Sequence, residues 1–417
     1  MKYQRITIVG GGTAGYLAVA YLCRMFPERN IRWIYPAENS PIGVGEATLP
    51  DMVNFLDEIG ISSDDIINHC NGSIKCGFRF DGFSGVTKSY FHSFSLHDER
   101  CRQERVPDNI LQLKSGIGLH FEVTALIALI ESRLQAHKNL TVIRSTVSYS
   151  DVKDTADIVI DCTGLSRQII KDIQPEDNFI SLLDRIPNNA ALVYRHKYTD
   201  PLREIKQYSI GTAMEYGWVW NIFLRREMTL GYVHPDRYDV KEEFINFLEK
   251  SICSKIDHSK IRKVNFTTGR NKIHLVDSNP PVVAIGLSSC FIEPMESTSL
   301  FITIFGIRLI RQYINGEVSA LEFNALINRE YESIANFVLA HYKYTNRCNE
   351  YWDSYKSIPI ENYAISECFD TPDWDHILIG MGHIQPTSEN LAEVAVRKLS
   401  VRKEQLFSEW LSSRGYG

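Results

Sequence analysis

The sequence predicts an α/β fold with a Rossmann-like dinucleotide-binding unit, a mixed sheet and a mainly helical C-terminal part. A GxGxxG motif at residues 10–15 lies between a short β-rich run and an apolar helical pattern. Residues from about 188 to 238 are rich in Tyr, Trp and Val, with the alternation that is typical of a sheet. From Ser299 onward few helix-breaking residues interrupt the chain, which indicates long helices.

Composition excludes several classes of protein. The 417 residues are 44% hydrophobic and 23% charged, which is ordinary for a globular chain, and the net charge of −6 gives no basic footprint for nucleic acid. The most apolar stretch, residues 300–307, is shorter than the roughly 18 residues that a membrane helix needs. The first strand-like run begins at Ile6, so we expect no signal peptide. Nine cysteines without a CxxC pair and twelve histidines without HExxH predict reduced thiols, a cytoplasmic location and no metal.

The N-terminal elements follow one another in the order strand, helix, strand. Residues 5–9 (RITIV) form the first β-rich run. Apolar residues with helical spacing follow from Tyr16 to Met25, and residues 31–35 form the second run, which Pro36 closes. Such a βαβ unit predicts parallel strands joined by a right-handed crossover.

Later elements are also visible in the sequence. We expect a helix that opens at His120, because the apolar residues from Leu126 to Leu134 have helical spacing. Residues 142–149 and 158–160 predict two further strands. No linker is evident, so we expect the pieces of the N-terminal unit to be spread along one interleaved body.

Each glycine of the GxGxxG motif has a physical reason. Gly10 makes the tight turn after the strand, Gly12 lets the backbone approach a pyrophosphate, and Gly15 lets the helix pack closely on the strand. The pyrophosphate would then rest on the helix N-terminus. Tyr35 stands where an acidic ribose ligand is usual, and Glu38 follows three residues later. Either the loop brings Glu38 to the ribose, or the ribose is held otherwise.

A second fragment favours FAD over NAD. Residues 157–164 (DIVIDCTG) form an apolar strand that ends at Asp161 and runs into a Thr163–Gly164 turn, whose small residues allow the backbone to approach a flavin. Alone, this is the pattern of any buried strand with a turn. It gains weight because it follows GxGxxG and precedes the apolar run VVAIG at residues 282–286. The order predicts a flavin-binding body of the monooxygenase type.

Six fragments, spread over nearly the whole chain, form a specific combination. They are GGGTAGY (10–16), GVGEATLP (43–50), DCTG (161–164), GWVWNIF (217–223), GLSSCFIEPMESTS (286–299) and HYKYTNRCNEYW (341–352). Together they resemble the flavin-dependent halogenases, in particular the tryptophan halogenase branch. Phe223 replaces the proline of the family's WxWxIP signature, Ser299 stands where a glycine is usual, and the chain is shorter than a typical tryptophan halogenase.

The resemblance implies an FAD site that receives reduced FAD from a separate NAD(P)H-dependent flavin reductase. Residues 1–350 would form the FAD-binding body with an interleaved substrate-side sheet, and residues 351–417 a helical part that completes the substrate site. The residues implied to bind FAD are Gly10, Gly12, Thr13, Ala14, Gly15, Glu38, Gly45, Glu46, Ala47, Thr163, Gly164, Gly286 and Pro294.

The resemblance also implies a reaction in two stages. Reduced FAD and oxygen convert a halide ion, chloride or bromide, to hypohalous acid, which then travels inside the protein to an aromatic substrate. Lys75 aligns with the family's essential lysine and would hydrogen-bond the hypohalous acid or exchange with it to a haloamine. From the residues alone, Lys75 could instead lie on the exposed face of a half-buried strand.

Glu296 is the second catalytic residue that the resemblance implies. Its carboxylate would stabilise the cationic ring intermediate and help remove its proton, with Ser297 supporting the geometry through a hydrogen bond. Backbone N–H groups of Thr298 and Ser299, at the start of a helix, would bind the halide ion. Without the resemblance, Glu293 and Glu296 are ordinary acidic residues of a helix's first turn.

Aromatic residues are the candidates for the substrate side. The implied substrate is an electron-rich ring, indole-like or tryptophan-like, free or within a larger molecule. For each candidate, ordinary packing in the core is the competing interpretation. The candidates are Trp218, Trp220, His92, Phe94, His120, Tyr351 and Trp352.

Two other functions stay open at this level. A flavin-dependent aromatic monooxygenase without halide chemistry shares GxGxxG and DCTG, and an inactive flavoprotein could serve as a partner-binding module. The presence of both Lys75 and Glu296 favours the halogenase. The sequence does not decide the exact substrate, the ring position, the halide or whether the chain forms a homo-oligomer.

Overall fold

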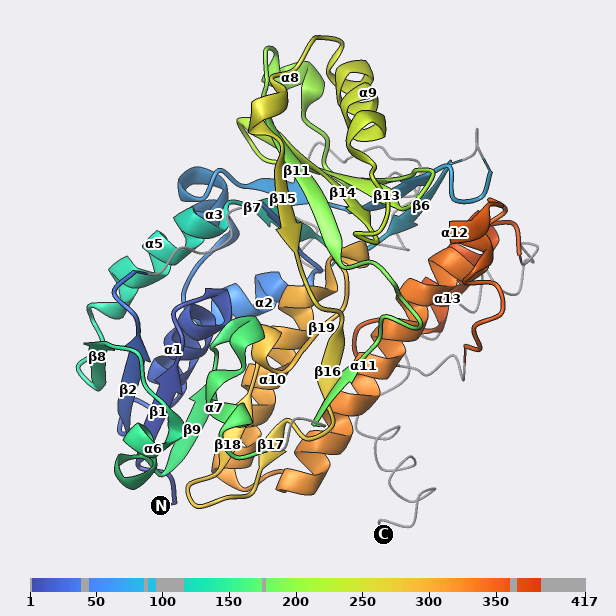
Figure 1. Cartoon of the computed structure of the whole chain (residues 1–417). Coiled ribbons are helices and arrows are strands. Elements are labelled where there is room, and N and C mark those ends of the chain that lie inside the picture. Colours follow the sequence, from blue (N-terminus) through green and yellow to red (C-terminus); the bar gives the residue numbers. More distant parts are fainter. Residues whose placement is uncertain are drawn as a thin grey trace.

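The computed structural model describes residues 2–38, 45–85, 89–94, 116–174, 178–360 and 366–383. A six-stranded, mainly parallel sheet and a seven-stranded mixed sheet dominate this part of the chain (Figure 1). The long helices α10 (Thr298–Asn315) and α11 (Ala320–Lys343) follow both sheets in the sequence. The predicted α/β fold with a mixed sheet and a helical C-terminal part is therefore confirmed.

The six-stranded sheet contains the N-terminal unit. Strand β1 pairs in parallel with β2 on one side and with β9 on the other, and β8 and β18 extend the sheet in parallel. Strand β17 adds an antiparallel edge. Helix α1 (Thr13–Met25) connects β1 to β2, as predicted. Across the sheet the strands are β17 (Leu275–Val276), β18 (Val282–Ala284), β9 (Ile158–Asp161), β1 (Arg5–Val9), β2 (Asn30–Tyr35) and β8 (Leu140–Arg144).

Helices cover both faces of this sheet. Successive side chains of a strand point to opposite faces, so β1 contributes to a core on each side. Ile6 and Ile8 of β1 belong to the core that also contains α1, α5 (Val123–Leu134) and α10. Val9 belongs to a second core with α7 (Gln168–Lys171). Both cores lie beside the strand ends where the GxGxxG turn and the Thr163–Gly164 turn begin.

The seven-stranded sheet is antiparallel except for the parallel pair β5 and β12. One face packs against α9 (Lys241–Ile252), and the other packs against α11 and α13 (Thr371–Gly380). Across the sheet the strands are β15 (Arg262–Asn265), β11 (Ala190–Lys197), β14 (Glu227–His234), β13 (Trp218–Phe223), β12 (Ser209–Ala213), β5 (Gly77–Asp81) and β6 (Ser89–Ser93).

Two three-stranded sheets and short helices complete the described fold. One sheet has the order β10 (Phe179–Ser181), β16 (Gly269–Asn271), β19 (Cys290–Phe291), and the other β3 (Glu46–Ala47), β7 (Gly118–Phe121), β4 (Ser73–Lys75). The other helices are α2 (Asp51–Glu58), α3 (Ser63–His69), α6 (Tyr149–Val152), η2 (Lys153–Thr155), η3 (Gly164–Ser166), α8 (Pro201–Glu204), η5 (His258–Lys260), η6 (Gly286–Ser288), η7 (Met295–Ser297) and α12 (Glu350–Asp353).

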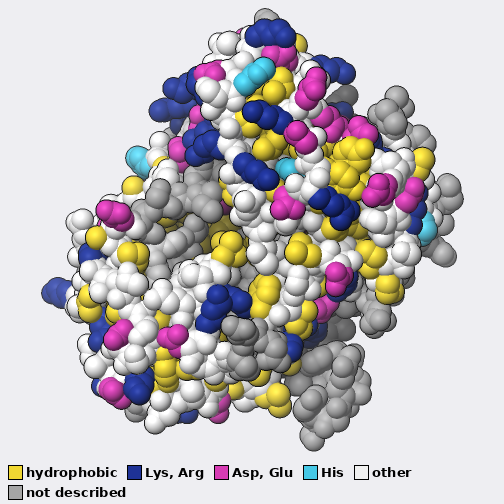
Figure 2. Space-filling model, in the orientation of Figure 1, with side chains coloured by type: hydrophobic (Ala, Val, Ile, Leu, Met, Phe, Trp, Pro, Cys, Tyr) yellow, Lys and Arg dark blue, Asp and Glu magenta, His cyan; other side chains and the backbone are white. Residues whose placement is uncertain are grey.

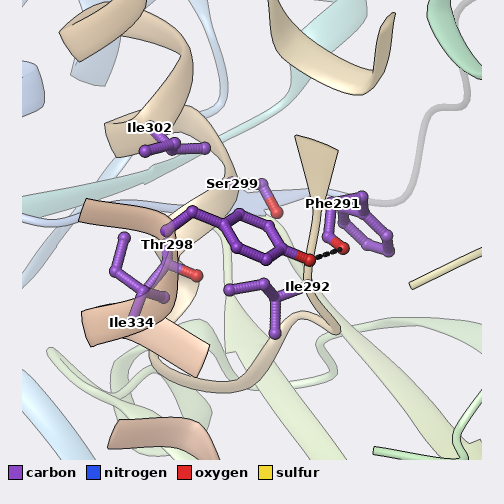
Figure 3. Close-up of a pocket in the computed structure, with 7 residues that line it drawn as sticks. Phe291, Ile292, Thr298, Ser299, Ile302 and Ile334 are labelled. Atoms are coloured by element: carbon purple, nitrogen blue, oxygen red, sulfur yellow. Dashed lines mark hydrogen bonds between the residues drawn. The ribbon is translucent and has the colours of Figure 1, made fainter. Parts of the chain in front are cut away.

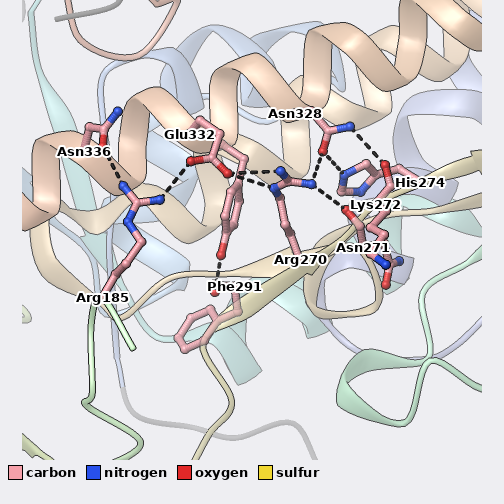
Figure 4. Close-up of polar contacts among 10 residues, drawn as sticks. Arg185, Arg270, Asn271, Lys272, His274, Phe291, Asn328, Glu332 and Asn336 are labelled. Carbon is pink, nitrogen blue, oxygen red and sulfur yellow. Dashed lines mark hydrogen bonds and ion pairs between the residues drawn. The ribbon is translucent and has the colours of Figure 1, made fainter. Parts of the chain in front are cut away.

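A polar network fastens the β10–β16–β19 sheet to α11 (Figure 4). The guanidinium of Arg270 on β16 donates to Glu332 at 3.1 Å and to Asn328 at 2.7 Å. Arg185 donates to the other oxygen of Glu332 at 3.0 Å, and His274 lies 3.1 Å from the Asn328 amide oxygen. Since β19 leads directly into the segment that carries Glu296, this network fixes the approach to that segment.

Two predicted elements differ from the structure. His120 lies in β7 rather than in a helix, because residues 118–121 pair with β3 and β4, and helix α5 begins only at Val123. The strand expected at residues 142–149 spans Leu140–Arg144 as β8, and Tyr149 begins helix α6. The side chains of Ser148 and Asp151 form a capping box there, which favours a helix start over continued strand.

The surface of the described residues mixes both signs of charge. Figure 2 shows Lys and Arg side chains interspersed with Asp and Glu over the visible face. Among the residues placed by the structure, no helix has the length and apolar character to cross a bilayer. Within the same residues, no cluster of three or more His, Cys, Asp or Glu side chains could hold a metal ion.

Candidate active site

The GxGxxG turn is shaped by close backbone contacts. Gly10 has φ of 121°, and a Cβ atom there would lie 2.2 Å from the carbonyl oxygen of Cys162. A Cβ atom on Gly15 would lie 2.1 Å from the carbonyl oxygen of Gly10. Only glycine fits these two positions, because β9 and α1 approach the turn too closely for any side chain.

Gly12 differs from its neighbours in the motif. A Cβ atom at Gly12 would meet nothing within 4 Å, although Gly12 is the N-cap of α1. Helix α1 has no side-chain cap and no acidic residue in its first turn. Its first N–H groups, which include those of Thr13 and Ala14, are therefore free of side-chain competition for an anion. This open, uncapped cradle fits a pyrophosphate.

A second turn meets the cradle from β9. The buried carboxylate of Asp161 accepts hydrogen bonds from the N–H of Thr163 at 2.9 Å and from the N–H of Ile170 at 2.9 Å. These bonds fix the turn that contains Gly164, which has φ of 70° and open space at its Cβ position. The hydroxyl of Ser288 donates to the Gly164 carbonyl at 3.2 Å, which joins the turn to η6.

Gly286 completes the cradle at the start of η6. A Cβ atom on Gly286 would lie 2.6 Å from the Cβ atom of Ala14 and 3.7 Å from the hydroxyl of Thr303 in α10. The GxGxxG helix, the Thr163–Gly164 turn and α10 therefore converge at one place. Open space at Gly12 and Gly164 beside these tight contacts is what a bound dinucleotide requires.

The other residues that sequence analysis assigned to FAD lie in different surroundings. Gly45 is buried with φ of 76° against the side chain of Thr229, and Ala47 pairs with His120 in the β3–β7 ladder. Burial raises the pKa of Glu46 to about 7. Glu38 is exposed, and Pro294 precedes η7.

Tyr35 has a packing role at the end of β2. Its side chain is buried against Trp33, with ring centroids 4.2 Å apart, and the guanidinium of Arg144 lies 3.9 Å from its ring centroid. The Trp33 indole N–H donates to the Gly10 carbonyl at 2.9 Å. The aromatic cluster thus supports the GxGxxG turn from behind, in the place where an acidic ribose ligand is usual.

Lys75, at the end of β4, is completely buried. Its ammonium donates a hydrogen bond to the Ser297 hydroxyl at 2.8 Å and lies 4.9 Å from the ring centroid of Phe94 and 5.2 Å from that of Phe78. Burial lowers the pKa of Lys75 to about 7, although the charge of Glu296 opposes this shift. The interpretation of Lys75 as an exposed strand residue is therefore wrong.

The backbone at Glu296 and Ser297 is left-handed, with φ of 60° and 62°. Non-glycine residues occupy this region at a cost, and two in succession indicate a position that the surrounding structure enforces. Both residues belong to η7 and form a kink directly before α10, and the side chain of Glu296 is completely buried. Glu296 therefore does not act as an ordinary acidic residue of a helix's first turn.

Two histidines surround the Glu296 carboxylate. Nδ1 of His92 lies 2.9 Å from Oε1, and Nε2 of His341 lies 3.2 Å from the same oxygen. Burial alone would raise the pKa of Glu296, but His92 and His341 together lower it to about 2. The second oxygen, Oε2, is buried without a hydrogen-bond partner among the residues that the structure describes. An ionised carboxylate with one unpaired oxygen can accept a hydrogen bond from a ligand.

Glu293, three residues earlier, belongs to a different network. Its carboxylate accepts hydrogen bonds from the Trp218 indole N–H at 3.2 Å, from the Asn188 amide and from the Tyr342 hydroxyl. Burial raises the pKa of Glu293 to about 7. The Tyr351 hydroxyl donates to Asn188 at 3.1 Å, so this network ties β13 to α11 and α12.

The predicted substrate-side aromatic residues differ in whether their polar groups are hydrogen-bonded within the core. The Trp352 indole N–H donates to the Met214 carbonyl at 3.0 Å, and the polar groups of Trp218 and Tyr351 are bonded in the Glu293 network. These contacts favour the packing interpretation for all three. Trp220 lies across Gly231, and its indole nitrogen has no partner within the described ranges.

His120 is buried behind Lys75. Its Nδ1 lies 3.1 Å from the Ser73 hydroxyl, its Nε2 lies 2.9 Å from the Ser209 hydroxyl, and the Ser73 hydroxyl donates to the Phe223 carbonyl. Burial, supported by the charge of Lys75, lowers the pKa of His120 well below its usual value. His120 is therefore a neutral link between β4, β12 and the end of β13.

Thr298 and Ser299 begin α10 beside a small hollow (Figure 3). Helix α10 has no acidic residue in its first turn and no side-chain cap from Ser297, so its first N–H groups can attract an anion. The lining residues are Phe291, Ile292, Thr298, Ser299, Ile302, Tyr331 and Ile334.

Sequence reasoning missed two residues of the cluster. His341 stands in the fragment HYKYTNRCNEYW, where nothing local distinguishes it from its neighbours. Asp373 lies outside all the fragments that carry the resemblance. Nε2 of His92 lies 3.3 Å from Oδ1 of Asp373. The pattern Asp370-x-x-Asp373 signals a helix start, but it cannot reveal a contact with a distant strand.

Comparisons with known proteins identify the family to which this chain is similar. The family profile described as tryptophan halogenase matches residues 5–150 and 131–396. The tryptophan 7-halogenase RebH of Lentzea aerocolonigenes is 24% identical over 93% of this chain and 87% of its own. The 7-chloro-L-tryptophan 6-halogenase KtzR of Kutzneria is 26% identical over 89% of this chain and 86% of its own.

Solved structures share the fold. BrvH, a flavin-dependent halogenase from Brevundimonas, superimposes with a TM-score of 0.77 at 21% identity, covering 98% of this chain and 99% of its own. The tryptophan 6-halogenase SttH from Streptomyces toxytricini gives a TM-score of 0.78 at 20% identity, covering 95% of both chains. The profile match covers well over half of the sequence, and on this ground the chain belongs to the tryptophan halogenase family.

Proposed function

We propose that this protein is an FAD-dependent halogenase that acts on an electron-rich aromatic ring, indole-like or tryptophan-like, through Lys75. The observation that carries the proposal is the completely buried Lys75 ammonium, which is bonded to Ser297, the residue after Glu296, and which feels the charge of the Glu296 carboxylate. A buried lysine next to an ionised, half-partnered carboxylate has no evident role in stability, because desolvation opposes both charges.

The FAD cradle lies next to this cluster along α10. Ser297 precedes the first residue of α10, and Thr303, just over one turn into the helix, contacts the Gly286 position. Gly10, Gly12, Thr13, Ala14, Gly15, Thr163, Gly164 and Gly286 would hold the cofactor. When bound and reduced by a separate NAD(P)H-dependent flavin reductase, FAD would supply, with oxygen, the oxidant that converts halide to hypohalous acid. The N–H groups of Thr298 and Ser299 would bind the halide.

Lys75 would hold hypohalous acid for attack by the ring. With a pKa of about 7, Lys75 has both ammonium and amine forms near neutral pH. The ammonium can donate a hydrogen bond to the acid's oxygen. The ring carbon then bonds to the halogen as the oxygen–halogen bond breaks, and the leaving oxygen takes a proton to become water. The amine can instead exchange with hypohalous acid to a haloamine and water, and afterwards pass the halogen to the ring.

Glu296 would complete the substitution. Its ionised carboxylate can stabilise the positive charge on the ring and accept the proton that the substituted carbon loses. The unpaired Oε2 is the atom available for this step, because Oε1 is hydrogen-bonded to His92 and also lies 3.2 Å from Nε2 of His341. The sum is one aromatic C–H and one hypohalous acid converted to one carbon–halogen bond and one water.

The substrate side would be built from β6, its neighbours and the C-terminal helices. Phe94 faces Lys75, and His92 packs against Phe337 and Phe369 with ring centroids 5.7 and 6.1 Å away. Helix α13 belongs to the part from residue 351 that we expect to complete the site. Residues 384–417 of that part lie outside the described residues.

The direct test is product analysis with the full chain, FAD, a flavin reductase, NADH, oxygen and bromide or chloride. Indole, tryptophan and a tryptophan-containing peptide are offered as substrates. We expect halide-dependent products with the mass and isotope pattern of one halogen. Hydroxylated product formed without halide would favour the monooxygenase instead, and no product from any aromatic compound would contradict both.

A further inference from the structure

We propose that Asp373 of α13 is a positioning residue that holds His92 as a cation against Glu296, so that α13 sets the orientation of the catalytic carboxylate. The inference rests on the proposed function of Glu296. It starts from a row of three side chains: Glu296, His92 and Asp373, in which each ring nitrogen of His92 faces a carboxylate oxygen, at 2.9 Å and 3.3 Å.

The proton count on His92 follows from this geometry. A neutral imidazole carries one N–H, so it could donate to only one carboxylate and would turn a lone pair toward the other. Two donors are required, and an imidazolium supplies them. Burial alone would lower the pKa of His92, but Glu296 and Asp373 together raise it to about 10. His92 therefore remains charged near neutral pH.

Other groups around His92 do not replace Asp373. Phe337 and His341 of α11, Phe369, and His376 of α13 pack near the ring, and Lys75 and Tyr90 lie near Glu296. Of these neighbours, Lys75, His341 and His376 are neutral or positive and Tyr90 is a neutral phenol. Asp373 is thus the second carboxylate that balances the His92 charge.

The sequence around α13 fixes Asp373 in place. The N–H of Asp370 donates to Oδ2 of Asp373 at 2.8 Å, and the N–H of Asp373 faces the Asp370 carboxylate at 3.3 Å. This capping box uses Oδ2 of Asp373, and Oδ1 is the oxygen that faces His92. The preceding turn is anchored as well, because the buried Glu330 of α11 accepts the N–H of Cys368 at 2.8 Å.

The consequence concerns the free oxygen of Glu296. His92 is held from both sides, so the His92–Glu296 bond fixes the carboxylate plane and leaves Oε2 turned away from His92. A neutral His92 would keep a single donor, which could move to Asp373 and release Glu296. Loss of the Asp373 charge should therefore affect the proton-transfer step more than the binding of the ring.

The test compares three variants of the full-length protein. Asp373→Asn removes the charge at nearly constant size, and Asp373→Glu restores it. Asp370→Ala removes the same helix cap but leaves the Asp373 carboxylate opposite His92. The readouts are kcat and KM for halogenation, and the His92 pKa from NMR of histidine-labelled protein, with the His92 signal assigned from His92→Gln.

We expect Asp373→Asn to lower kcat about tenfold with KM changed less than about twofold, and to lower the His92 pKa by more than one unit. Asp373→Glu should recover both in part, and Asp370→Ala should leave the His92 pKa unchanged. An unchanged His92 pKa in Asp373→Asn, or an equal fall in Asp370→Ala, would overturn the proposal. The NMR measurement needs no turnover, so absence of halogenation in the wild type would refute the proposed function separately.

Discussion

At the scale of single residues, Lys75 shows a conflict between stability and chemistry. Its ammonium is buried against two aromatic rings and bonded to one hydroxyl, which is poor compensation for lost hydration. Proteins tolerate such groups where function requires them. We expect Lys75→Met to abolish halogenation while reduced FAD still reacts with oxygen. The measurement is halogenated product together with hydrogen peroxide release, and product at a near wild-type rate would remove Lys75 from the mechanism.

The same variant makes a prediction about stability and pH. The pKa of Lys75 is about 7 in the folded protein and near its ordinary value of 10.5 when unfolded, so the unfolded chain binds more protons between these values. The burial cost of the ammonium is complete below pH 7 and disappears as the pH rises toward 10. Lys75→Met should therefore melt at a higher temperature than the wild type at pH 6, with the difference shrinking as pH rises. A lower melting temperature at pH 6 would mean that the ammonium is well compensated.

Glu296 and Glu293 form a matched pair for a second test. Glu296→Gln keeps the shape of the side chain but cannot accept the ring proton, so we expect kcat to fall by roughly 10²–10⁴-fold, the range for one positioned acid–base group. Glu293→Gln should change kcat far less, because Glu293 has a pKa of about 7 and contacts packing residues. Equal losses in both variants would indicate that Glu296 matters through folding.

The sequence allowed some residues of the candidate site to be predicted but not others, for physical reasons. Lys75 and Glu296 could be named because they stand in fragments that resemble a known family. Their burial could not, and neither could the bond from Lys75 to Ser297, the chain neighbour of Glu296, since 222 positions separate Lys75 from Ser297 in the sequence. Asp373 was out of reach, because its visible pattern is a helix cap and its contact lies 281 residues away.

At the scale of elements, two glycines of the GxGxxG turn have different roles: Gly10 is required by close packing, whereas Gly12 leaves space for a ligand. A Cβ atom on Gly10 would collide with the Cys162 carbonyl, whereas a Cβ atom on Gly12 would meet nothing within 4 Å. We expect Gly10→Ala to destabilise the fold. Gly12→Val should leave the apo melting temperature nearly unchanged but weaken FAD binding, measured by quenching of flavin fluorescence. Normal FAD binding by a well-folded Gly12→Val protein would place the pyrophosphate elsewhere.

Other elements show where local patterns mislead. Residues from Leu126 to Leu134 have helical spacing and lie in α5. The predicted helix, however, begins at His120, which lies in β7. Nothing local distinguishes these residues, because β7 is fixed by pairing with β3 and β4, which precede it by many residues. Strand β9 and its turn were predicted well, since Asp161 and the glycine turn are local signals.

At the scale of the whole molecule, the proposed cofactor cradle and the cluster around Glu296 meet along α10. The cradle that we propose for FAD comes from the six-stranded sheet, while Lys75, His92 and Glu296 come from β4, β6 and the kink before α10. Helix α11 then carries His341 to the same carboxylate. This interleaving explains why no linker is visible in the sequence. The cradle and the cluster around Glu296 each combine segments that lie far apart in the chain.

The surroundings of Lys75 and Glu296 lead to a prediction about substrate choice. Lys75, His92 and Asp373 already have polar partners inside this cluster, and the nearby rings of Phe94 and Phe337 are apolar. Free tryptophan would need partners for its ammonium and carboxylate, and each unpaired polar group costs about 1–3 kcal/mol. The carboxylates of Glu296 and Asp373 add repulsion for the substrate's own carboxylate.

We therefore expect the site to select the ring and to make loose demands on the rest of the molecule. Simple indoles, or tryptophan within a short peptide, should react at least as well as free tryptophan. The measurement is kcat/KM for tryptophan, 3-methylindole and a blocked tryptophan peptide under the same conditions. A preference for free tryptophan above about 100-fold, worth about 2.7 kcal/mol, would show that its charged groups are held specifically.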